Sequence, residues 1–78
     1  MTARYSIISR AGADFGVYEG GTPAEALLHL FERAGYSTHI AERKVWLEDG
    51  ELRFADEETR RLLGDISDWI IGIVEDDE

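Results

Sequence analysis

The segment of residues 19–36 carries a complete set of helix signals, and it limits the fold more than any other part of the chain. Thr22 is typical of a helix N-cap, Glu25 three residues later completes a capping box, and the proline between them suits the first helical position. The apolar residues that follow recur at helical spacing, and these are Ala24, Leu27, Leu28 and Phe31. Gly35 can end the helix in the left-handed conformation. We therefore predict a helix over residues 23–34, with one apolar stripe that packs against the rest of the chain.

Length and composition limit what such a chain can do. Seventy-eight residues make one small domain, which buries roughly 60% of its unfolded surface and has a small core. The sequence has no cysteine, which excludes disulfides and thiolate metal sites and fits a reducing cytoplasm. The longest apolar run is too short for a membrane span, and the first residues lack the apolar stretch of a signal peptide. We expect a single cytoplasmic domain over residues 1–75, followed by an acidic tail at 76–78.

The net charge of −9 is large for this length and unevenly distributed. Residues 1–39 hold four acids and three bases, whereas residues 40–78 hold thirteen acids and five bases. Direct binding to nucleic acid is disfavoured, because the phosphate backbone attracts the opposite charge. Such charge can serve solubility alone, or it can direct the protein to a basic partner.

Two segments predict β-hairpins. Residues 4–9 and 15–19 have strand character and are joined by a short loop with a turn glycine. Further on, Asp49-Gly50 between alternating residues is a strong signal for a two-residue hairpin turn. Closing that turn places four apolar residues on one face, namely Val45, Leu47, Leu52 and Phe54. Trp46 and Arg53 then lie opposite each other on the other face.

The remaining segments complete an α+β fold. Residues 37–44 allow a short helical turn, and residues 56–63 predict a second helix with acids in its first turn and arginines in its last. Residues 68–75 are dense in β-branched residues and favour a strand, although apolar spacing also allows the second helix to continue to Val74. We predict a small antiparallel or mixed sheet of two hairpins plus the C-terminal strand. Helix 23–34 packs on one face, and the second helix lies beside it.

The order of these elements resembles a group of short uncharacterised proteins from bacteria, phages and mobile elements. The residues that carry the resemblance are Gly-Val-Tyr-Glu at 16–19, Thr-Pro-Ala-Glu-Ala-Leu at 22–27 and Ala-Gly-Tyr at 34–36. They cover about the first half of the chain and are structural, so no catalytic residue can be carried over. The resemblance implies an inhibitor of host defence, for example an anti-CRISPR protein. The hairpin and Gly-x-Thr-x-x-Glu-Ala-Leu are also similar to the N-terminal half of HicB-like antitoxins, whose third strand before the helix this chain lacks.

No residue pattern indicates catalysis or cofactor binding. His29 and His39 lack the spacing of a zinc site, and we expect both at the surface or its boundary. The serines lack a nucleophile-elbow context, the glycines form no phosphate loop, and the acid runs do not match a calcium loop. We predict that the protein is not an enzyme and holds no metal or cofactor.

The aromatic and acidic residues of the second half favour binding to a protein. The predicted partner-binding residues are Trp46, Glu48, Asp49, Glu51, Asp56, Glu57 and Glu58. A tryptophan on the face away from the core is typical of an interface anchor, although it could instead cover a second small core under residues 37–44. Carboxylates along a rigid face can stand in for phosphates and steer onto a basic groove.

Three hypotheses for function follow from these features. The first is an inhibitor that occupies a basic, nucleic-acid-binding surface of a partner, such as a CRISPR effector or another nucleic-acid-binding complex. The second is a HicB-like antitoxin, which would need a basic DNA-binding segment that this chain lacks. The third is a small accessory domain with charge for solubility only. The small core and Trp46 also raise the hypothesis of a homodimer.

Overall fold

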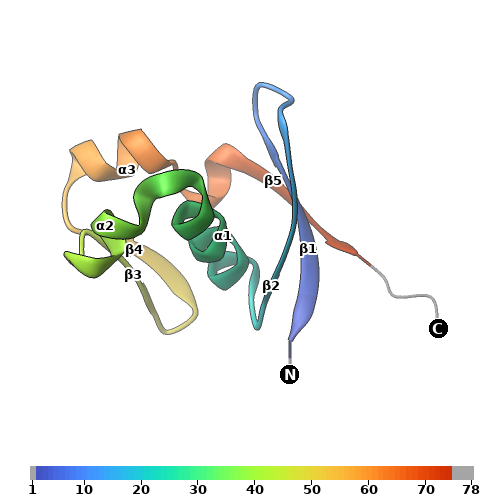
Figure 1. Cartoon of the computed structure of the whole chain (residues 1–78), viewed down its shortest axis with the longest axis horizontal. Helices are drawn as coiled ribbons and strands as arrows, with labels where there is room; N and C mark the ends of the chain where they lie inside the picture. The colour runs from blue at the N-terminus through green and yellow to red at the C-terminus, as the bar shows by residue number, and fades with distance from the viewer. Residues whose placement is uncertain (1, 75–78) are drawn as a thin grey trace.

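The computed structural model describes residues 2–74 and shows an α+β fold, which confirms the predicted fold class (Figure 1). Its elements are, in chain order, β1 (Ala3–Ser9), β2 (Asp14–Gly20), α1 (Pro23–Phe31), a kinked segment (Glu32–Tyr36), α2 (Ser37–Ala41), β3 (Val45–Glu48), β4 (Glu51–Phe54), α3 (Glu57–Leu63), a 3-10 turn (Ile66–Asp68) and β5 (Trp69–Val74). The predicted acidic tail at 76–78 lies outside the described residues. No helix in residues 2–74 is long and apolar enough to cross a membrane.

The caps predicted for α1 are present, with one difference at each end. Thr22 Oγ1 accepts the backbone N–H of Glu25 at 3.2 Å, as a capping box requires. The Glu25 carboxylate, however, accepts the backbone N–H of Gly21 instead of that of Thr22. α1 ends at Phe31 and not at Ala34, and Glu32–Tyr36 joins it to α2 across a kink. Gly35 in this segment has a φ of 101°, the left-handed conformation predicted for it.

The strands divide between two sheets. β2, β1 and β5 form an antiparallel sheet in that order, and β3 pairs only with β4 within the described residues. α1 contacts strands of both sheets and lies between them (Figure 1). The alternative in which α3 continues as a helix to Val74 is wrong, because a 3-10 turn separates α3 from β5. Asp68 Oδ2 accepts the backbone N–H of Asp65 at 2.9 Å, as part of a capping box that begins this turn after Gly64 has ended α3.

The β3–β4 hairpin has the predicted register. Val45 pairs with Phe54, Trp46 with Arg53, Leu47 with Leu52, and Glu48 with Glu51. Asp49 and Gly50 both have positive φ, at 54° and 77°, as a two-residue turn of this twist needs.

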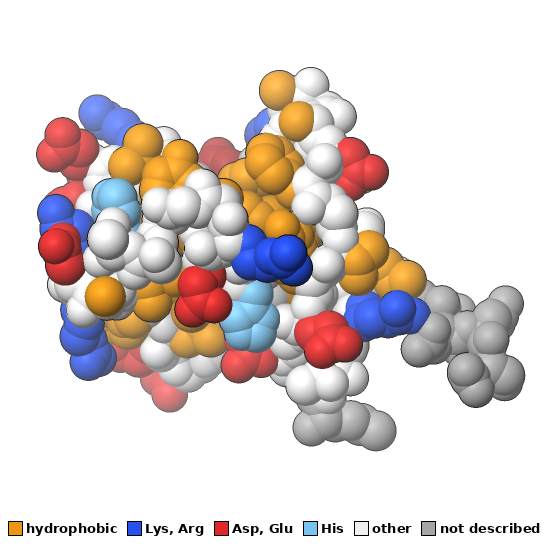
Figure 2. Space-filling view, in the orientation of Figure 1, with side chains coloured by type: hydrophobic (Ala, Val, Ile, Leu, Met, Phe, Trp, Pro, Cys, Tyr) orange, Lys and Arg blue, Asp and Glu red, His pale blue; other side chains and the backbone are white. Residues whose placement is uncertain are grey.

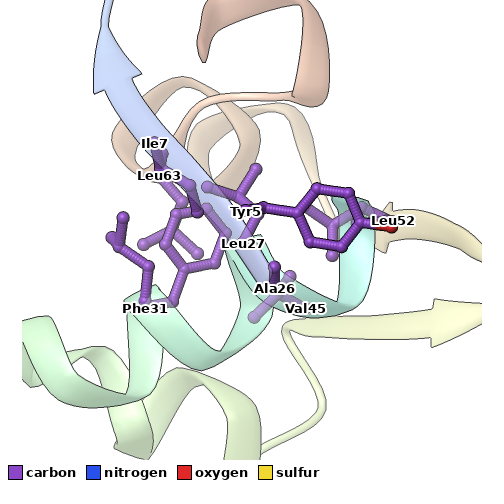
Figure 3. Close-up of a cluster of buried hydrophobic side chains, with 10 residues drawn as sticks. Tyr5, Ile7, Ala26, Leu27, Phe31, Val45, Leu52 and Leu63 are labelled. Atoms are coloured by element: carbon purple, nitrogen blue, oxygen red, sulfur yellow. The ribbon is translucent and has the colours of Figure 1, made fainter. Parts of the chain in front are cut away.

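The core lies where α1 meets the two sheets (Figure 3). Its buried residues are Tyr5, Ile7, Ala24, Ala26, Leu27, Leu30, Phe31, Val45, Leu52 and Leu63. Leu28, predicted in the apolar stripe, is half-buried, whereas Leu30 and Ala26 are fully covered. The buried face of α1 is wider than the predicted stripe because sheets cover the helix on two sides.

Candidate partner-binding surface

The tip of the β3–β4 hairpin concentrates three exposed carboxylates. Glu48 and Glu51 lie directly opposite each other, and Asp49 is in the turn between them. Like charges at opposite positions repel each other. Arg53 reduces this repulsion, since its Nη2 lies 3.8 Å from Glu51 Oε1. The tip therefore presents negative charge on a turn of defined geometry.

Trp46 lies beside this acidic tip. Its indole N–H donates to Glu48 Oε1 at 3.2 Å, and its position is opposite Arg53, as predicted. The side chain is half-buried, whereas the sequence predicted an exposed one. The hydrogen bond places the indole N–H beside the carboxylate of Glu48 at the acidic tip.

Asp56 precedes α3 and caps its N-terminus. Its Oδ1 accepts the backbone N–H of Thr59 at 2.7 Å, which makes it the N-cap of the helix. Hydrogen bonds from the Thr59 backbone and side chain lower the pKa of the Asp56 carboxyl below its ordinary value. Asp56 therefore carries its charge at neutral pH, at the end of the helix where the dipole favours negative charge.

Arg60 joins two carboxylates on the same side of the molecule. Its Nη1 lies 3.4 Å from Glu57 Oε2, and its Nη2 lies 3.3 Å from Asp65 Oδ2. Two adjoining hollows, of about 460 and 360 Å³, share Arg53 and Asp65 in their walls. We call the charged residues that line them the β4–α3 face, and they are Glu51, Arg53, Asp56, Glu57, Arg60 and Asp65. This face carries four carboxylates and two guanidinium groups.

The predicted site residues fall into neighbouring groups. Glu51, Asp56 and Glu57 belong to the β4–α3 face, and Glu48 and Asp49 lie at the hairpin tip. The sixth acid, Glu58, lines a neighbouring hollow with His39 and Lys44, and Asp56 lines both this hollow and the β4–α3 face. Arg60 and Asp65 also line this surface and are not among the predicted partner-binding residues. The spacing of Glu57 and Arg60 on one helix was a visible signal for their pair.

Ion pairs offset part of the negative charge. All acids between residues 42 and 68 are exposed except Asp65, which is half-buried. Four of them have an ion pair, namely Glu42, Glu51, Glu57 and Asp65. In Figure 2 red and blue side chains accordingly lie side by side over α2, α3 and the β3–β4 hairpin. Exposed pairs of this kind contribute little stability, so these carboxylates can exchange their partner for another cation.

Neither histidine belongs to the β4–α3 face, although His39 lines a hollow together with Asp56. His29 is exposed, and its Nδ1 is 2.6 Å from the carbonyl oxygen of Glu19, so this nitrogen donates the hydrogen bond. His39 is half-buried and packs edge-on against Tyr36, with ring centroids 5.7 Å apart. Both contacts are those of structural side chains at the surface or its boundary.

An apolar hollow of about 280 Å³, which no sequence pattern predicted, lies between the β1–β2 hairpin and α3. Trp69 forms one wall, with its ring centroid 5.2 Å from that of Phe15 and 6.3 Å from that of Phe31. Leu62 on α3 also lines the hollow and is exposed. Figure 2 shows hydrophobic side chains gathered between α3 and the β1–β2 hairpin. The strand pattern around Phe15 and Trp69 does not reveal that they meet, because they are distant in the chain.

Comparisons of the chain with models of protein families, with curated proteins and with solved structures gave no match. The likeness to phage-type proteins and to HicB-like antitoxins therefore stays a hypothesis, and the geometry of the surface carries the functional argument.

Proposed function

We propose that the protein is a cytoplasmic interaction module that binds a basic, nucleic-acid-binding surface of a partner protein and inhibits it. The observation that carries this proposal is the row of exposed carboxylates from the hairpin tip across the β4–α3 face. Residues 21–68, which contain that row, carry a net charge of −5. A partner of this kind, such as a CRISPR effector, offers lysines and arginines placed for phosphates.

The mechanism is exchange of ion pairs. Arg53 and Arg60 hold carboxylates in position in the free protein, at 3.3–3.8 Å. A basic groove would compete for the same carboxylates, and the negative field of the surface would accelerate the encounter. Trp46 would add an apolar contact at the edge of the acidic tip, since its indole is already held there by Glu48.

A second candidate is an accessory domain whose charge serves solubility. The ion pairs of Lys44, Arg53 and Arg60 favour it, because pairwise neutralisation weakens any directed field. The two candidates differ in one respect that can be measured. Directed binding depends on where the charges are, whereas solubility depends only on their number.

The experiment compares two charge-reversed variants with the same change in net charge. Glu48→Lys/Glu51→Lys changes the hairpin tip, and Glu19→Lys/Glu32→Lys changes exposed acids on β2 and beyond α1. The partner is first isolated as a basic protein that the immobilised chain captures and that double-stranded DNA elutes. The kinetics of its binding to each variant are then measured. At about 50 mM salt the tip variant should associate at least about tenfold more slowly, because steering acts on the encounter.

The control variant should associate within about threefold of the unmodified protein under the same conditions. Trp46→Ala should act on dissociation and cost about 2 kcal/mol, provided that the indole is buried in the complex. The solubility role alone would remain if the affinity is equal at about 50 and about 500 mM salt and neither double variant changes the association rate.

A further inference from the structure

β5 is an open edge of the three-stranded sheet. It pairs with β1 and with no other strand in residues 2–74. Its sequence, Trp-Ile-Ile-Gly-Ile-Val, contains no charge, and Ile70 and Ile73 are 56% and 68% exposed. Figure 2 shows hydrophobic side chains at the surface over β5. An apolar edge with free backbone groups is a template for another strand.

The opposite edge of the same sheet is protected. β2 contains a bulge, since the register with β1 shifts between Ser6 and Ile8. It also carries the exposed acids Asp14 and Glu19. Bulges and charges are the usual devices that prevent a strand from pairing further. β5 has neither device between its first and last residue.

We propose that β5 pairs with β5 of a second copy of this chain, antiparallel and about a two-fold axis at Gly72. In this register Ile71 lies opposite Ile73 of the second copy, and Ile70 lies opposite Val74 of the second copy. Directly opposed residues share a face, so each exposed apolar residue of the strand gains an apolar neighbour. Ile71 and Ile73 are on the α1 side, because Ile71 pairs with the buried Ile7.

The charge distribution favours a second copy at this edge. Residues 3–20 and 69–74, which form the sheet and its loop, have no net charge, whereas residues 21–68 have −5. Within the described residues, two copies therefore repel each other least when their sheets approach.

Packing of two sheets face to face would leave Ile73 uncovered. The outer face carries Ile8, Val17 and Ile70, but Ile73 is on the α1 side of β5 and points away from it. Ile73 is also the most exposed of the large hydrophobic residues of the described chain. Pairing along the edge covers it, and face-to-face packing does not.

A single introduced cysteine tests the register. The chain has no cysteine, and a side chain added at Gly72 meets only Ser6 Oγ at 3.9 Å, so Gly72→Cys fits. Opposed Cβ atoms in an antiparallel pair lie about 4.5–5.5 Å apart, near the disulfide range. Under mild oxidation Gly72→Cys should form covalent dimers at least about tenfold faster than Leu62→Cys on α3, which is 56% exposed. Equal rates would overturn the proposal.

Light scattering tests the dimer without a covalent bond. At high micromolar concentration the mass should reach twice 8.8 kDa, and Ile73→Lys should raise the dimer dissociation constant by about 100-fold or more. Val17→Lys on β2 should leave it within about threefold. Circular dichroism confirms that both variants fold. A mass of 8.8 kDa at every concentration, or loss of the dimer in Val17→Lys alone, would contradict edge pairing.

Salt separates this dimer from the proposed partner binding. Raising salt from about 50 to about 500 mM should leave self-association unchanged or strengthen it, because screening reduces the repulsion between like-charged copies. Binding to a basic partner should weaken over the same range. A dimer that dissociates at high salt would show that charges and not β5 hold it together.

Discussion

The three-stranded sheet and the β3–β4 hairpin with α3 surround the same helix, α1, but their surfaces differ in charge and in exposed apolar residues. The sheet and its loop carry no net charge and expose Val17, Ile70 and Ile73. The region of residues 21–68 has a net charge of −5 and exposes carboxylates held by arginines. The difference shows that the charge of the described residues is distributed unevenly between the two regions. Under the two proposals, the first region would pair through its backbone and the second would attract a basic partner.

The largest loss of stability is expected at a side chain in the core between the two regions. Leu27 of α1 is fully buried in the core between the sheets (Figure 3). Leu27→Ala should lower the free energy of unfolding by about 2–5 kcal/mol, through lost burial and the cavity left behind. Urea denaturation measures the change. Leu62→Ala, at a leucine that is 56% exposed, should stay within about 0.5 kcal/mol.

The two tryptophans allow the unfolding of each region to be followed separately by fluorescence. Trp46 reports on the β3–β4 hairpin and Trp69 on the three-stranded sheet, so Trp69→Phe and Trp46→Phe leave one reporter each. In each variant we expect the fluorescence midpoint to coincide with the midpoint from circular dichroism, because α1 contacts both sheets. Separate midpoints would show that the regions unfold independently and would weaken the claim of one shared core.

A smaller loss of stability is expected at the joint between α3 and β5. Gly64 has a φ of 89°, and a Cβ there would lie 2.8 Å from Trp69 Nε1. Gly64→Ala therefore adds backbone strain and displaces the indole, whose N–H donates to the Leu63 carbonyl at 3.3 Å. The expected cost is about 1–3 kcal/mol.

Gly12→Ala is the control for this substitution. Gly12 also has a positive φ, at 94°, but nothing lies within 4 Å of an added Cβ. The difference between the two losses of stability gives the contribution of the contact with Trp69, apart from the cost of a positive φ in alanine. Equal losses of stability in urea denaturation would mean that the position of Trp69 is not fixed by Gly64.

Local signals predicted the parts of both regions that depend on near neighbours. Asp49-Gly50 predicted the turn and the full register of the hairpin, since the pattern and the turn lie in one segment. The N-cap at Thr22 was predictable for the same reason. The division of the strands between two sheets was not predictable. No pattern within β5 indicates that it pairs with β1, which lies sixty or more residues earlier in the chain. The sequence predicted one sheet for lack of that information.

The candidate surface was predictable to a similar extent. Exposure of the acids followed from their spacing on strands and at a helix start, and it is confirmed for Glu48, Glu51 and Glu57. The bridge from Arg60 to Asp65 required the fold, because the chain turns between α3 and β5 to bring Asp65 back. Which face two segments share is a property of their packing and not of either segment alone.

The pH dependence of stability should identify the contribution of the helix start. Hydrogen bonds from Thr59 lower the pKa of Asp56 in the folded state, whereas the unfolded chain has the ordinary value of 3.8. The stability from this group is present above that value and is lost as pH falls through the lower, folded pKa. Asp56→Asn keeps an acceptor for Thr59 but should remove this part of the acid sensitivity.

The measurement is urea denaturation at a series of acidic pH values for the unmodified protein, Asp56→Asn and Asp49→Asn. Asp49 lies in the hairpin turn with a positive φ of 54°, which asparagine tolerates, and it caps no helix. We expect the acid-induced loss to become shallower in Asp56→Asn than in Asp49→Asn. Identical slopes would show that the N-cap does not titrate as proposed.

The smallest effect on stability, and the sharpest test of the acidic surface, is expected at Arg60. Arg60→Gln removes the ion pairs with Glu57 and Asp65, which are exposed or half-buried, so the free energy of unfolding should fall by about 1 kcal/mol at most. The β4–α3 face then has one guanidinium group for four carboxylates, and association with a basic partner should accelerate. Arg61→Gln has the same charge change at a neighbouring exposed arginine for which the described part of the chain provides no ion pair. A larger acceleration in Arg60→Gln than in Arg61→Gln, at about 50 mM salt, would assign the steering to the β4–α3 face, whereas equal rates would assign it to net charge alone.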